Sequence, residues 1–471
     1  MPQFTETMGE ISPGLLGFTV SAIMFAGALP SFFSGPPADR YGRLAVVAVG
    51  AGSFVVGAVL QASAMSLAQF ITGRIFAGAG EGIFLGIMNV YICEISPSAR
   101  RGTLASMPQL FSVLAMCGGY FTAYGSVKIQ SSMAWRLPFL LMAAVAAALF
   151  ALCFLLPPSP RGLMLQGRQE EAIAAIERLG IQQAEAEKDI LHVRDEDVSK
   201  MHTSFFHSLR IIWARQYRSR TILALFILGM VQLCGIDGIM YYAPTLFARA
   251  GLPENTAGFL ASGLSGILVV LISIPAAILA DKWGRRTWVI VGGVMLSSLM
   301  FLMGIMYAAK AVHETGAGRW VVIISIFAFS MSYAATWAFV GKIYASEIQP
   351  GHTRAASNAV AQSLGFITNG VVALITPILL AKTAYGAYFL FGGLSFGTLV
   401  VLALYMPETR GEPLESIQEV FSKPLQLHGI ERLLHRRFRN SPIPSGHESE
   451  GSSIELDDLS RTHVASVRVM A

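Results

Sequence analysis

Charged residues are scarce in this chain. Asp, Glu, Lys and Arg make up 13% of its 471 residues, whereas a soluble domain carries about 25%. Hydrophobic residues make up 54%, enough for about eleven membrane helices of roughly 20 residues each. This composition excludes an ordinary soluble enzyme, a disordered protein and a single-pass receptor. The apolar runs are continuous rather than alternating, which argues against a transmembrane β-barrel.

Signals for disulfides, metals and nucleotides are also missing. The cysteines lie inside apolar stretches, so we expect buried free thiols rather than disulfides or metal ligands. They are Cys93, Cys117, Cys153 and Cys234. The histidines have no metal-ligand spacing and no Walker A sequence is present, so we expect no cofactor, no ATP-driven activity and no enzyme. A net charge of +5 does not indicate a nucleic acid partner, and residues 1–10 lack the basic n-region of a signal peptide.

Eleven apolar stretches of membrane-spanning length run along the chain. They lie near 13–36, 44–65, 68–93, 103–125, 134–157, 219–248, 256–280, 287–309, 319–345, 355–382 and 385–406. The polar break between the fifth and sixth stretches contains apolar residues at helical spacing, which predict a surface amphipathic helix over 164–179.

These stretches divide the chain into four predicted parts. An N-terminal helical half covers 1–157, a cytoplasmic helical linker domain covers 158–218, and a C-terminal six-helix half covers 219–423. The segment 424–471 begins with basic residues and becomes rich in Ser, Pro, Glu and Asp. That composition is typical of a disordered tail.

Basic residues gather in alternate connections between the apolar stretches. They are Arg40 and Arg43, then Arg100 and Arg101, then the linker, then Lys282, Arg285 and Arg286, and finally Arg354 and the tail. Since Lys and Arg are enriched in cytoplasmic loops, we expect these connections and the C-terminus to face the cytoplasm. With eleven spans, the N-terminus then lies outside.

Two motifs occur twice, about 250 residues apart. Asp39-Arg40-Tyr41-Gly42-Arg43 recurs as Asp281-Lys282-Trp283-Gly284-Arg285. Tyr91-x-x-Glu94-Ile95-x-Pro97-x-x-x-Arg101 recurs as Tyr344-x-x-Glu347-Ile348-x-Pro350-x-x-x-Arg354, and Pro157-x-Ser159-Pro160-Arg161 loosely matches Pro407-Glu408-Thr409-Arg410. Two parallel repeats in a polytopic helical protein indicate a transporter whose site lies between the halves.

The repeated motifs place acidic and basic side chains at the predicted cytoplasmic helix ends. Partly desolvated ion pairs there can bias an equilibrium between two conformations by a few kcal/mol. We therefore predict gating or coupling roles for Asp39, Arg43, Glu94, Arg101, Asp281, Arg285, Glu347 and Arg354. The alternative interpretation is that these residues only anchor the topology.

The chain resembles the sugar porter family of the major facilitator superfamily from Gly14 to Phe421. The resemblance rests on Gly35-x-x-x-Asp39-Arg40-x-Gly42-Arg43, Arg74-x-x-x-Gly78-x-Gly80-x-Gly82, Tyr91 to Gly102, Trp135-Arg136-Leu137-Pro138, Gln232 to Gly251, and Pro407-Glu408-Thr409-Arg410-Gly411 with Leu414-Glu415. It implies an all-α polytopic membrane fold of two parallel six-helix halves. The segment Ile239-Met240-Tyr241-Tyr242-Ala243-Pro244 and the tail look similar to fungal members.

The family has twelve helices, and its first helix has no counterpart here, so we expect eleven spans with family helix one missing. In proton-coupled members, that helix carries an acid near the arginine that matches Arg74. The resemblance further implies substrate contacts at Gln109, Gln232, Asp237, Tyr241, Tyr242, Trp337, Lys342, Phe366 and Asn369. Amide and hydroxyl groups suit sugar hydroxyls, and aromatic faces suit sugar C–H surfaces. Gly235 and Gly238 would let the seventh family helix bend.

Three ionisable residues depart from the family pattern. Asp237 stands where the family has asparagine, Lys342 stands where it has tryptophan, and Glu81 stands where an apolar residue is common. Ionisable groups at membrane depth are costly and usually functional. We hypothesise that Asp237 and Lys342 pair or hold a charged substrate, and that Glu81, seven residues after Arg74, carries a proton. The alternatives are a structural pair and a carboxyl without coupling.

The sequence thus predicts a transporter of a sugar or related polyol that works by alternating access, with or without a coupled proton, in the plasma membrane. A second hypothesis changes the cargo to a charged or unusual molecule, such as a sugar acid, an organic acid or a fungal metabolite. A third is a sugar sensor that does not transport, although such sensors usually carry a long folded tail.

Overall fold

The computed structural model describes residues 2–97, 101–179, 205–215, 217–251, 257–313, 316–338, 341, 344–345, 348 and 351–408. The described residues all belong to one compact unit, which lies within Met1–Leu427. The predicted tail lies outside the described residues. Helices and their connections make up all of the described part of the unit, in agreement with the all-α prediction.

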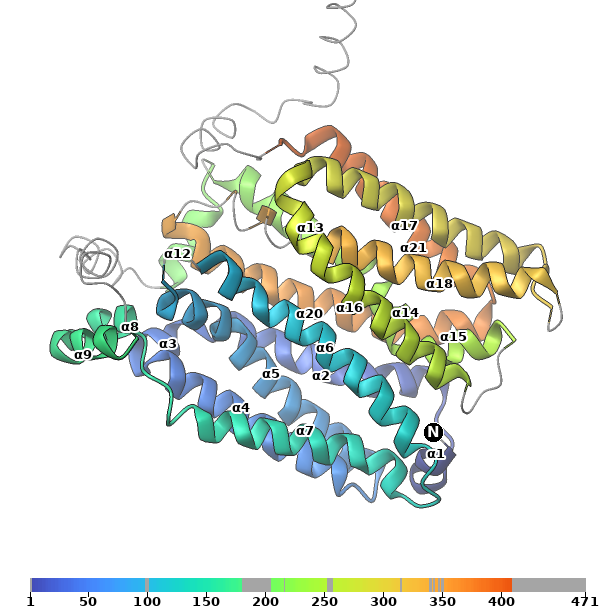
Figure 1. Cartoon of the computed structure of the whole chain (residues 1–471), viewed down its shortest axis with the longest axis horizontal. Coiled ribbons are helices and arrows are strands. Elements are labelled where there is room, and N and C mark those ends of the chain that lie inside the picture. The colour runs from blue at the N-terminus through green and yellow to red at the C-terminus, as the bar shows by residue number, and fades with distance from the viewer. Residues whose placement is uncertain are drawn as a thin grey trace, which may run out of the picture. The chain divides into compact units, whose positions relative to one another are not determined.

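Long helices follow the predicted apolar stretches closely (Figure 1). In the N-terminal half they are α2 (Pro13–Phe33), α4 (Arg43–Ala62), α5 (Leu67–Ile95), α6 (Arg101–Ser126) and α7 (Met133–Leu152). In the C-terminal half they are α13 (Arg218–Leu233), α14 (Ile236–Tyr241), α15 (Ala243–Arg249), α16 (Ala257–Trp283), α17 (Arg285–Ala308), α18 (Ala317–Ala335), α20 (Gly351–Lys382) and α21 (Gly386–Tyr405). Short helices α1 (Pro2–Met8), α3 (Gly35–Tyr41) and α12 (Phe205–Ile212) lie between or before them.

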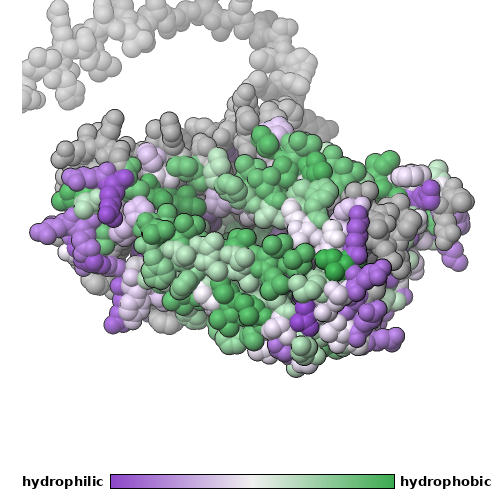
Figure 2. All heavy atoms as spheres, turned by 60° about the horizontal axis from the view of Figure 1, so that its bottom comes forward, coloured by the Kyte–Doolittle hydropathy of each residue, from purple (hydrophilic) through white to green (hydrophobic). Residues whose placement is uncertain are grey.

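Nine described helical segments are long and apolar enough to cross a membrane. The remaining two predicted spans correspond to α6, which is less apolar than most of the others, and α16, whose described apolar part is the shorter run Ser262–Ala276. Figure 2 shows apolar side chains across the middle of one face and hydrophilic side chains at its two ends. This pattern matches a band of lipid-facing surface between two aqueous interfaces.

Glycines let the helices of the N-terminal half approach closely. On α5, Gly78 and Gly82 contact the backbone of α2, where a Cβ atom at Gly82 would overlap the carbonyl oxygen of Gly27. Gly80, on another face of α5, contacts α4 near Phe54. In a membrane, where lipid is as apolar as the helices, the close packing that small residues allow holds such crossings together.

The two halves meet through two helix pairs. Helix α2 packs along α20, and α6 packs along α16, as Figure 1 shows. The hydroxyl of Tyr120 on α6 donates to the carbonyl oxygen of Met240 on α14 at 2.7 Å. Because both pairs join one half to the other, their packing decides how the halves can move relative to each other.

The sequence repeat is also a structural repeat. The hydroxyl of Tyr91 donates to the carbonyl oxygen of Pro157 at 2.8 Å, and Tyr344 donates to Pro407 at 3.2 Å. Gly42 and Gly284 both have the positive φ that favours glycine, 97° and 87°, and each precedes a long helix. Equivalent residues of the two halves therefore make equivalent contacts.

A Tyr91→Phe variant is expected to lower the free energy of unfolding by about 1 kcal/mol, because it removes the hydrogen bond to Pro157 and leaves that carbonyl unsatisfied. Denaturation in mixed micelles measures the change. Tyr41→Phe is the matched control. Tyr41 is 66% exposed, and its ring, which contacts Arg40, is kept when the hydroxyl is removed. Equal stability of both variants and wild type would contradict this role of Tyr91.

The predicted amphipathic helix over 164–179 is instead two helices, α8 (Pro160–Leu165) and α9 (Gln169–Leu179). Gly167, with φ of 76°, makes the turn between them. The expected apolar face is present, because Leu163 of α8 packs with Ala172 and Ala175 of α9 in one buried cluster.

Helix α7 is much less buried than α21, its counterpart in the repeat. Both have 20 residues, but α7 buries four of them and α21 buries eight. Helix α21 packs on α17 and α13, whereas α7 packs mainly on α4. Packing against the described helices therefore buries fewer residues of α7 than of α21. The absence of family helix one stays a prediction.

Candidate functional site

The sixth apolar stretch, predicted over 219–248 and matched by the resemblance to family helix seven, is broken twice. Gly235, with φ of 88°, ends α13 and starts α14, and Tyr242 separates α14 from α15. A Cβ atom at Gly235 would lie 2.6 Å from the ring of Phe391. Both this close contact and the positive φ therefore exclude larger residues at the position. The expected bend at Gly235 is confirmed, whereas Gly238 lies inside α14 against Thr376.

This break brings polar side chains of α13 and α14 against α18 and α20. Tyr333 of α18 donates to the side-chain oxygen of Gln232 at 3.1 Å. Tyr241 donates to the side-chain oxygen of Asn369 on α20 at 3.1 Å and is 39% exposed. Tyr242 is buried, and its hydroxyl donates to the carbonyl oxygen of Ala373 at 2.9 Å. Two tyrosine–amide pairs therefore lie near one another at membrane depth.

Arg74 and Glu81 approach the same region from α5. Seven residues correspond to almost two turns, so both side chains project from one helix face. Arg74 lies within electrostatic range of Glu81, Tyr241 and Tyr242, and its Cζ atom lies 5.3 Å from the ring centroid of Phe70. Its Nε atom is buried without a hydrogen-bond partner among the described residues. A guanidinium in this state can gain a partner when the helices move.

Asp237 belongs to the same polar region. It follows the Gly235 break on the first turn of α14 and lies within electrostatic range of Tyr241 and Tyr333. Amide, phenol and carboxylate groups from α13, α14, α18 and α20 therefore lie near one another, and Arg74 of α5 lies within electrostatic range of Tyr241 and Tyr242 among them. Such a set can hold a small molecule that carries several hydroxyl groups.

Of three further predicted contact residues, Trp337 and Phe366 lie in packed surroundings. Trp337 is 1% exposed, and its indole N–H donates to the carbonyl oxygen of Val289 on α17 at 2.9 Å. Phe366 is buried on α20, with its ring 3.0 Å from where a Cβ atom of Gly27 would lie. Gln109 is half-buried on α6. Contact of these three side chains with a substrate stays a prediction.

The gating residues Asp39, Arg43 and Glu94 form one cluster. Arg43 is buried and makes a bidentate contact with Glu94, with Nε–Oε2 and Nη2–Oε1 distances of 3.1 and 3.2 Å. Its Nη1 atom contacts Asp39 at 2.7 Å. The hydroxyl of Ser159 donates to Glu94 at 2.5 Å, which ties the start of α8 to α4 and α5. Charge-assisted contacts of this kind fix helix ends strongly.

Several predicted residues cannot be placed in these contacts. Lys342 and Glu347 lie outside the described residues, and so do the side chains of Arg101, Asp281 and Arg354. Arg285 begins α17, where its backbone N–H donates to Glu408 at 2.8 Å. Their gating roles, and the pairing of Asp237 with Lys342, stay predictions.

Sequence reasoning missed Tyr333 and Ser159 as members of these clusters. Tyr333 is 101 residues from its partner Gln232, and Ser159 is 65 residues from Glu94. The one available signal was for Ser159, which lies inside the loosely repeated Pro157 motif.

The chain matches the family model described as "Sugar (and other) transporter" over residues 5–421. It is 31% identical to "Sugar carrier protein A" of Ricinus communis over 412 residues, which cover 86% of this chain and 77% of that protein. It is 29% identical to "Probable metabolite transport protein CsbC" of Bacillus subtilis, with 86% of each chain covered. Among solved structures, the inward open conformation of the xylose transporter XylE from E. coli superposes with a TM-score of 0.73, at 21% identity, covering 89% of this chain and 93% of that one.

Proposed function

The chain belongs to the sugar porter family of the major facilitator superfamily, and on this premise we propose that it carries a sugar or related polyol across a membrane by alternating access. It is an integral membrane protein of a transporter family, not an enzyme. We propose that it lies in the plasma membrane. We propose that its C-terminus lies in the cytoplasm, because the basic connections gather on one predicted side.

The observation that carries the proposal is the polar region around the Gly235 break. Tyr333 with Gln232 and Tyr241 with Asn369 present paired hydroxyl and amide groups from different helices. A sugar that enters between them can exchange these protein–protein hydrogen bonds for protein–substrate ones. Because the partners sit on separate helices, substrate binding alters contacts between helices, which a moving transporter requires.

The Arg43 cluster supplies the second element of the proposed mechanism. It joins the ends of α4 and α5 to the start of α8 at the predicted cytoplasmic side. Rearrangement of its contacts would accompany opening of the cytoplasmic side, and its charge-assisted bonds would favour the closed state. Proton coupling is part of the proposal and is assigned to Glu81, which lies within electrostatic range of Arg74.

Asp237 supports a second candidate cargo. A carboxylate where the family has an amide favours a substrate that carries a positive charge or donates more hydrogen bonds than an ordinary hexose. A sugar acid would instead require Lys342 to outweigh Asp237. These alternatives differ in substrate class and share the alternating-access mechanism.

Uptake into proteoliposomes tests the proposal. The purified chain is supplied with a panel of radiolabelled neutral hexoses, pentoses, polyols, amino sugars and sugar acids, with and without an imposed pH gradient. Saturable uptake of a neutral sugar or polyol supports the first candidate, and uptake restricted to charged members supports the second. Absence of uptake for every member, from liposomes in which the protein is folded, contradicts both.

An Asp237→Asn variant is expected to change selectivity by about tenfold, equivalent to about 1.4 kcal/mol, because it removes a charge but keeps a similar shape. The ratio of uptake for neutral and charged members of the panel measures the shift. Glu177→Gln, on the exposed side of α9, is the control for the loss of one negative charge. An unchanged ratio would show that Asp237 does not choose the substrate.

A further inference from the structure

The start of α17 in the C-terminal half is capped by a carboxylate. Glu408 accepts hydrogen bonds from the backbone N–H groups of Arg285 at 2.8 Å and Arg286 at 3.2 Å. Gly284 makes this possible, because its missing Cβ leaves room for the carboxylate oxygen. The first N–H groups of a helix have no partner inside the helix and attract negative charge.

The N-terminal half repeats this geometry without the carboxylate. Gly42 has φ and ψ of 97° and 150°, against 87° and 140° for Gly284. Arg43 and Leu44 correspond to Arg285 and Arg286, but the residue that corresponds to Glu408 is Pro158. Proline has no oxygen in its side chain, so it cannot replace the carboxylate of the other half.

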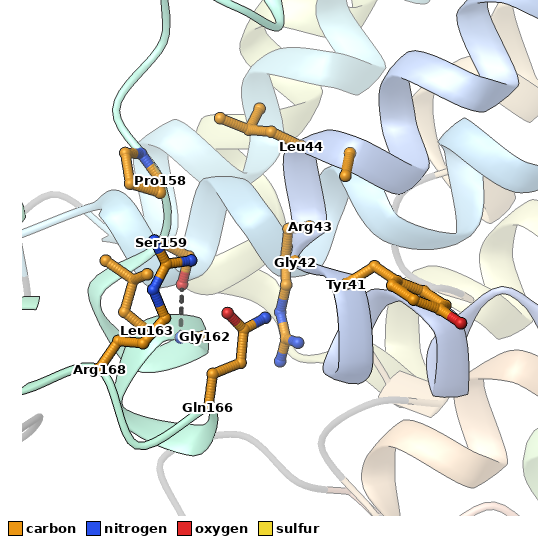
Figure 3. A pocket seen from close by; sticks show the side chains of 11 residues that line it. Tyr41, Gly42, Arg43, Leu44, Pro158, Ser159, Gly162, Leu163, Gln166 and Arg168 are labelled. Carbon is orange, nitrogen blue, oxygen red and sulfur yellow. Dashed lines mark hydrogen bonds between the residues drawn. The ribbon is translucent and has the colours of Figure 1, made fainter. Parts of the chain in front are cut away.

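A pocket of about 120 Å³ lies at this position (Figure 3). Backbone and side chains of α4 line one side, beginning at Gly42, and Ser159, Gln166 and Arg168 of the α8 region line the other. The side-chain Nε2 of Gln166 lies 3.7 Å from where a Cβ atom of Gly42 would be. This nitrogen donates to the carbonyl oxygen of Arg40 at 3.4 Å, and its second hydrogen remains for the place that corresponds to the one Glu408 occupies beside Gly284. The volume is several times what one water molecule needs.

We infer that this pocket binds an oxyanion with the chemistry of a phosphate group, which takes the place of the carboxylate that caps the equivalent helix in the other half. Two of its oxygens would accept from the N–H groups of Arg43 and Leu44, as the oxygens of Glu408 accept from Arg285 and Arg286. Gln166 and Arg168 would donate from the α8 side. This site is distinct from the substrate region around Gly235.

The charges around the pocket permit an anion. The carboxylates of Asp39 and Glu94 are engaged by the side chain of Arg43, and Glu171 is engaged by Arg168 at 2.6 Å. Arg168 is 53% exposed and contacts Glu171 through Nε and Nη2, so its Nη1 can donate to a bound phosphate while Glu171 stays paired. The phosphate could come from solution or from a lipid headgroup, since the pocket lies at the predicted cytoplasmic interface.

Thermal unfolding of the full chain in detergent tests the inference. Millimolar inorganic phosphate is expected to raise the melting temperature of wild type by about 2 °C over chloride at equal ionic strength, by preferential binding to the folded state. Short-chain phosphatidic acid, compared with phosphatidylcholine, tests the lipid source. A response to both probes identifies a general phosphate site, and a response to the lipid alone identifies a headgroup site.

A Pro158→Glu variant is expected to melt higher than wild type without phosphate and to lose the response to both probes, because its carboxylate fills the pocket. Arg168→Gln is expected to weaken the response severalfold, and it tests the inference independently if Pro158→Glu does not fold. Ala174→Glu, on the exposed face of α9, adds the same charge elsewhere and should respond like wild type. If phosphate and phosphatidic acid both leave the melting temperature of wild type unchanged, the inference is wrong. It is also wrong if the melting temperatures of wild type, Pro158→Glu and Arg168→Gln rise equally, since an equal rise reflects only general stabilisation by salt.

Discussion

Transport by a Glu81→Gln variant is expected to lose its response to a proton gradient. Glu81 is an ionisable residue in the middle of α5 and lies within electrostatic range of Arg74 and Tyr241. Ionised Glu81 attracts Arg74, whereas protonated Glu81 does not, so one proton can change the balance between two arrangements of these helices. Glutamine keeps the shape of the protonated side chain and cannot release a proton.

The size of the effect follows from the driving force. A gradient of one pH unit corresponds to about 1.4 kcal/mol, which can support up to about tenfold accumulation of substrate when one proton is coupled to each molecule. Wild-type proteoliposomes should approach that ratio. The Glu81→Gln variant should reach only equal concentrations on both sides, while exchange of labelled for unlabelled substrate continues.

Two controls separate coupling from general damage. Glu177→Gln removes an exposed carboxylate from α9 and should accumulate substrate like wild type. Asp237→Asn, measured in the same assay, tests whether the coupled proton binds to the other carboxylate of the polar region. Accumulation that persists in Glu81→Gln and disappears in Asp237→Asn would move the proton site to Asp237, and persistence in both would leave neither carboxylate with a coupling role.

The positions of the helices were predictable because the length and apolar composition of each stretch are enough to indicate a membrane-spanning helix, whatever it packs against. The predicted stretch near 44–65 is α4 (Arg43–Ala62), and the stretch near 385–406 is α21 (Gly386–Tyr405). The division of the linker helix at Gly167 was not predictable, because a positive φ at a glycine depends on how α9 folds back onto Leu163 of α8. The apolar residues on the two sides of this turn keep a helical spacing in the sequence, so the sequence pattern does not reveal the turn.

The polar region was predicted only in part, for a related reason. The resemblance identified Gln232, Tyr241 and Asn369 from motif positions, yet it gave no partner for Gln232. The hydrogen bond from Tyr333 depends on where α18 crosses α13, and that crossing is a property of three-dimensional packing. Trp337 illustrates the opposite case. Its contact with substrate stays a prediction, whereas the packing of its ring against glycines 292 and 293 of α17 was not predicted.

The contact between α2 and α5 supports the largest expected effect on stability. A Gly82→Ala variant is expected to lose most of its folded protein, because the added Cβ atom would overlap the carbonyl oxygen of Gly27. Backbone atoms on the opposing helix cannot turn aside as a side chain can, so the two helices must separate along their length. Overpacking of this kind costs about 3 kcal/mol, a large fraction of the stability of a typical protein.

The same substitution at Gly118 of α6 provides a control with the opposite sign. A Cβ atom at Gly118 meets no described atom within 4 Å, and alanine restricts the unfolded chain more than glycine does. Gly118→Ala is therefore expected to raise stability by about 0.5 kcal/mol. The yield of monodisperse protein and its melting temperature measure both variants. If Gly82→Ala and Gly118→Ala have the same stability, close contact between α2 and α5 does not stabilise this half. Helix α2 also packs along α20 of the other half, so a stable Gly82→Ala variant would show that α2 can shift on α5 without loss of the fold.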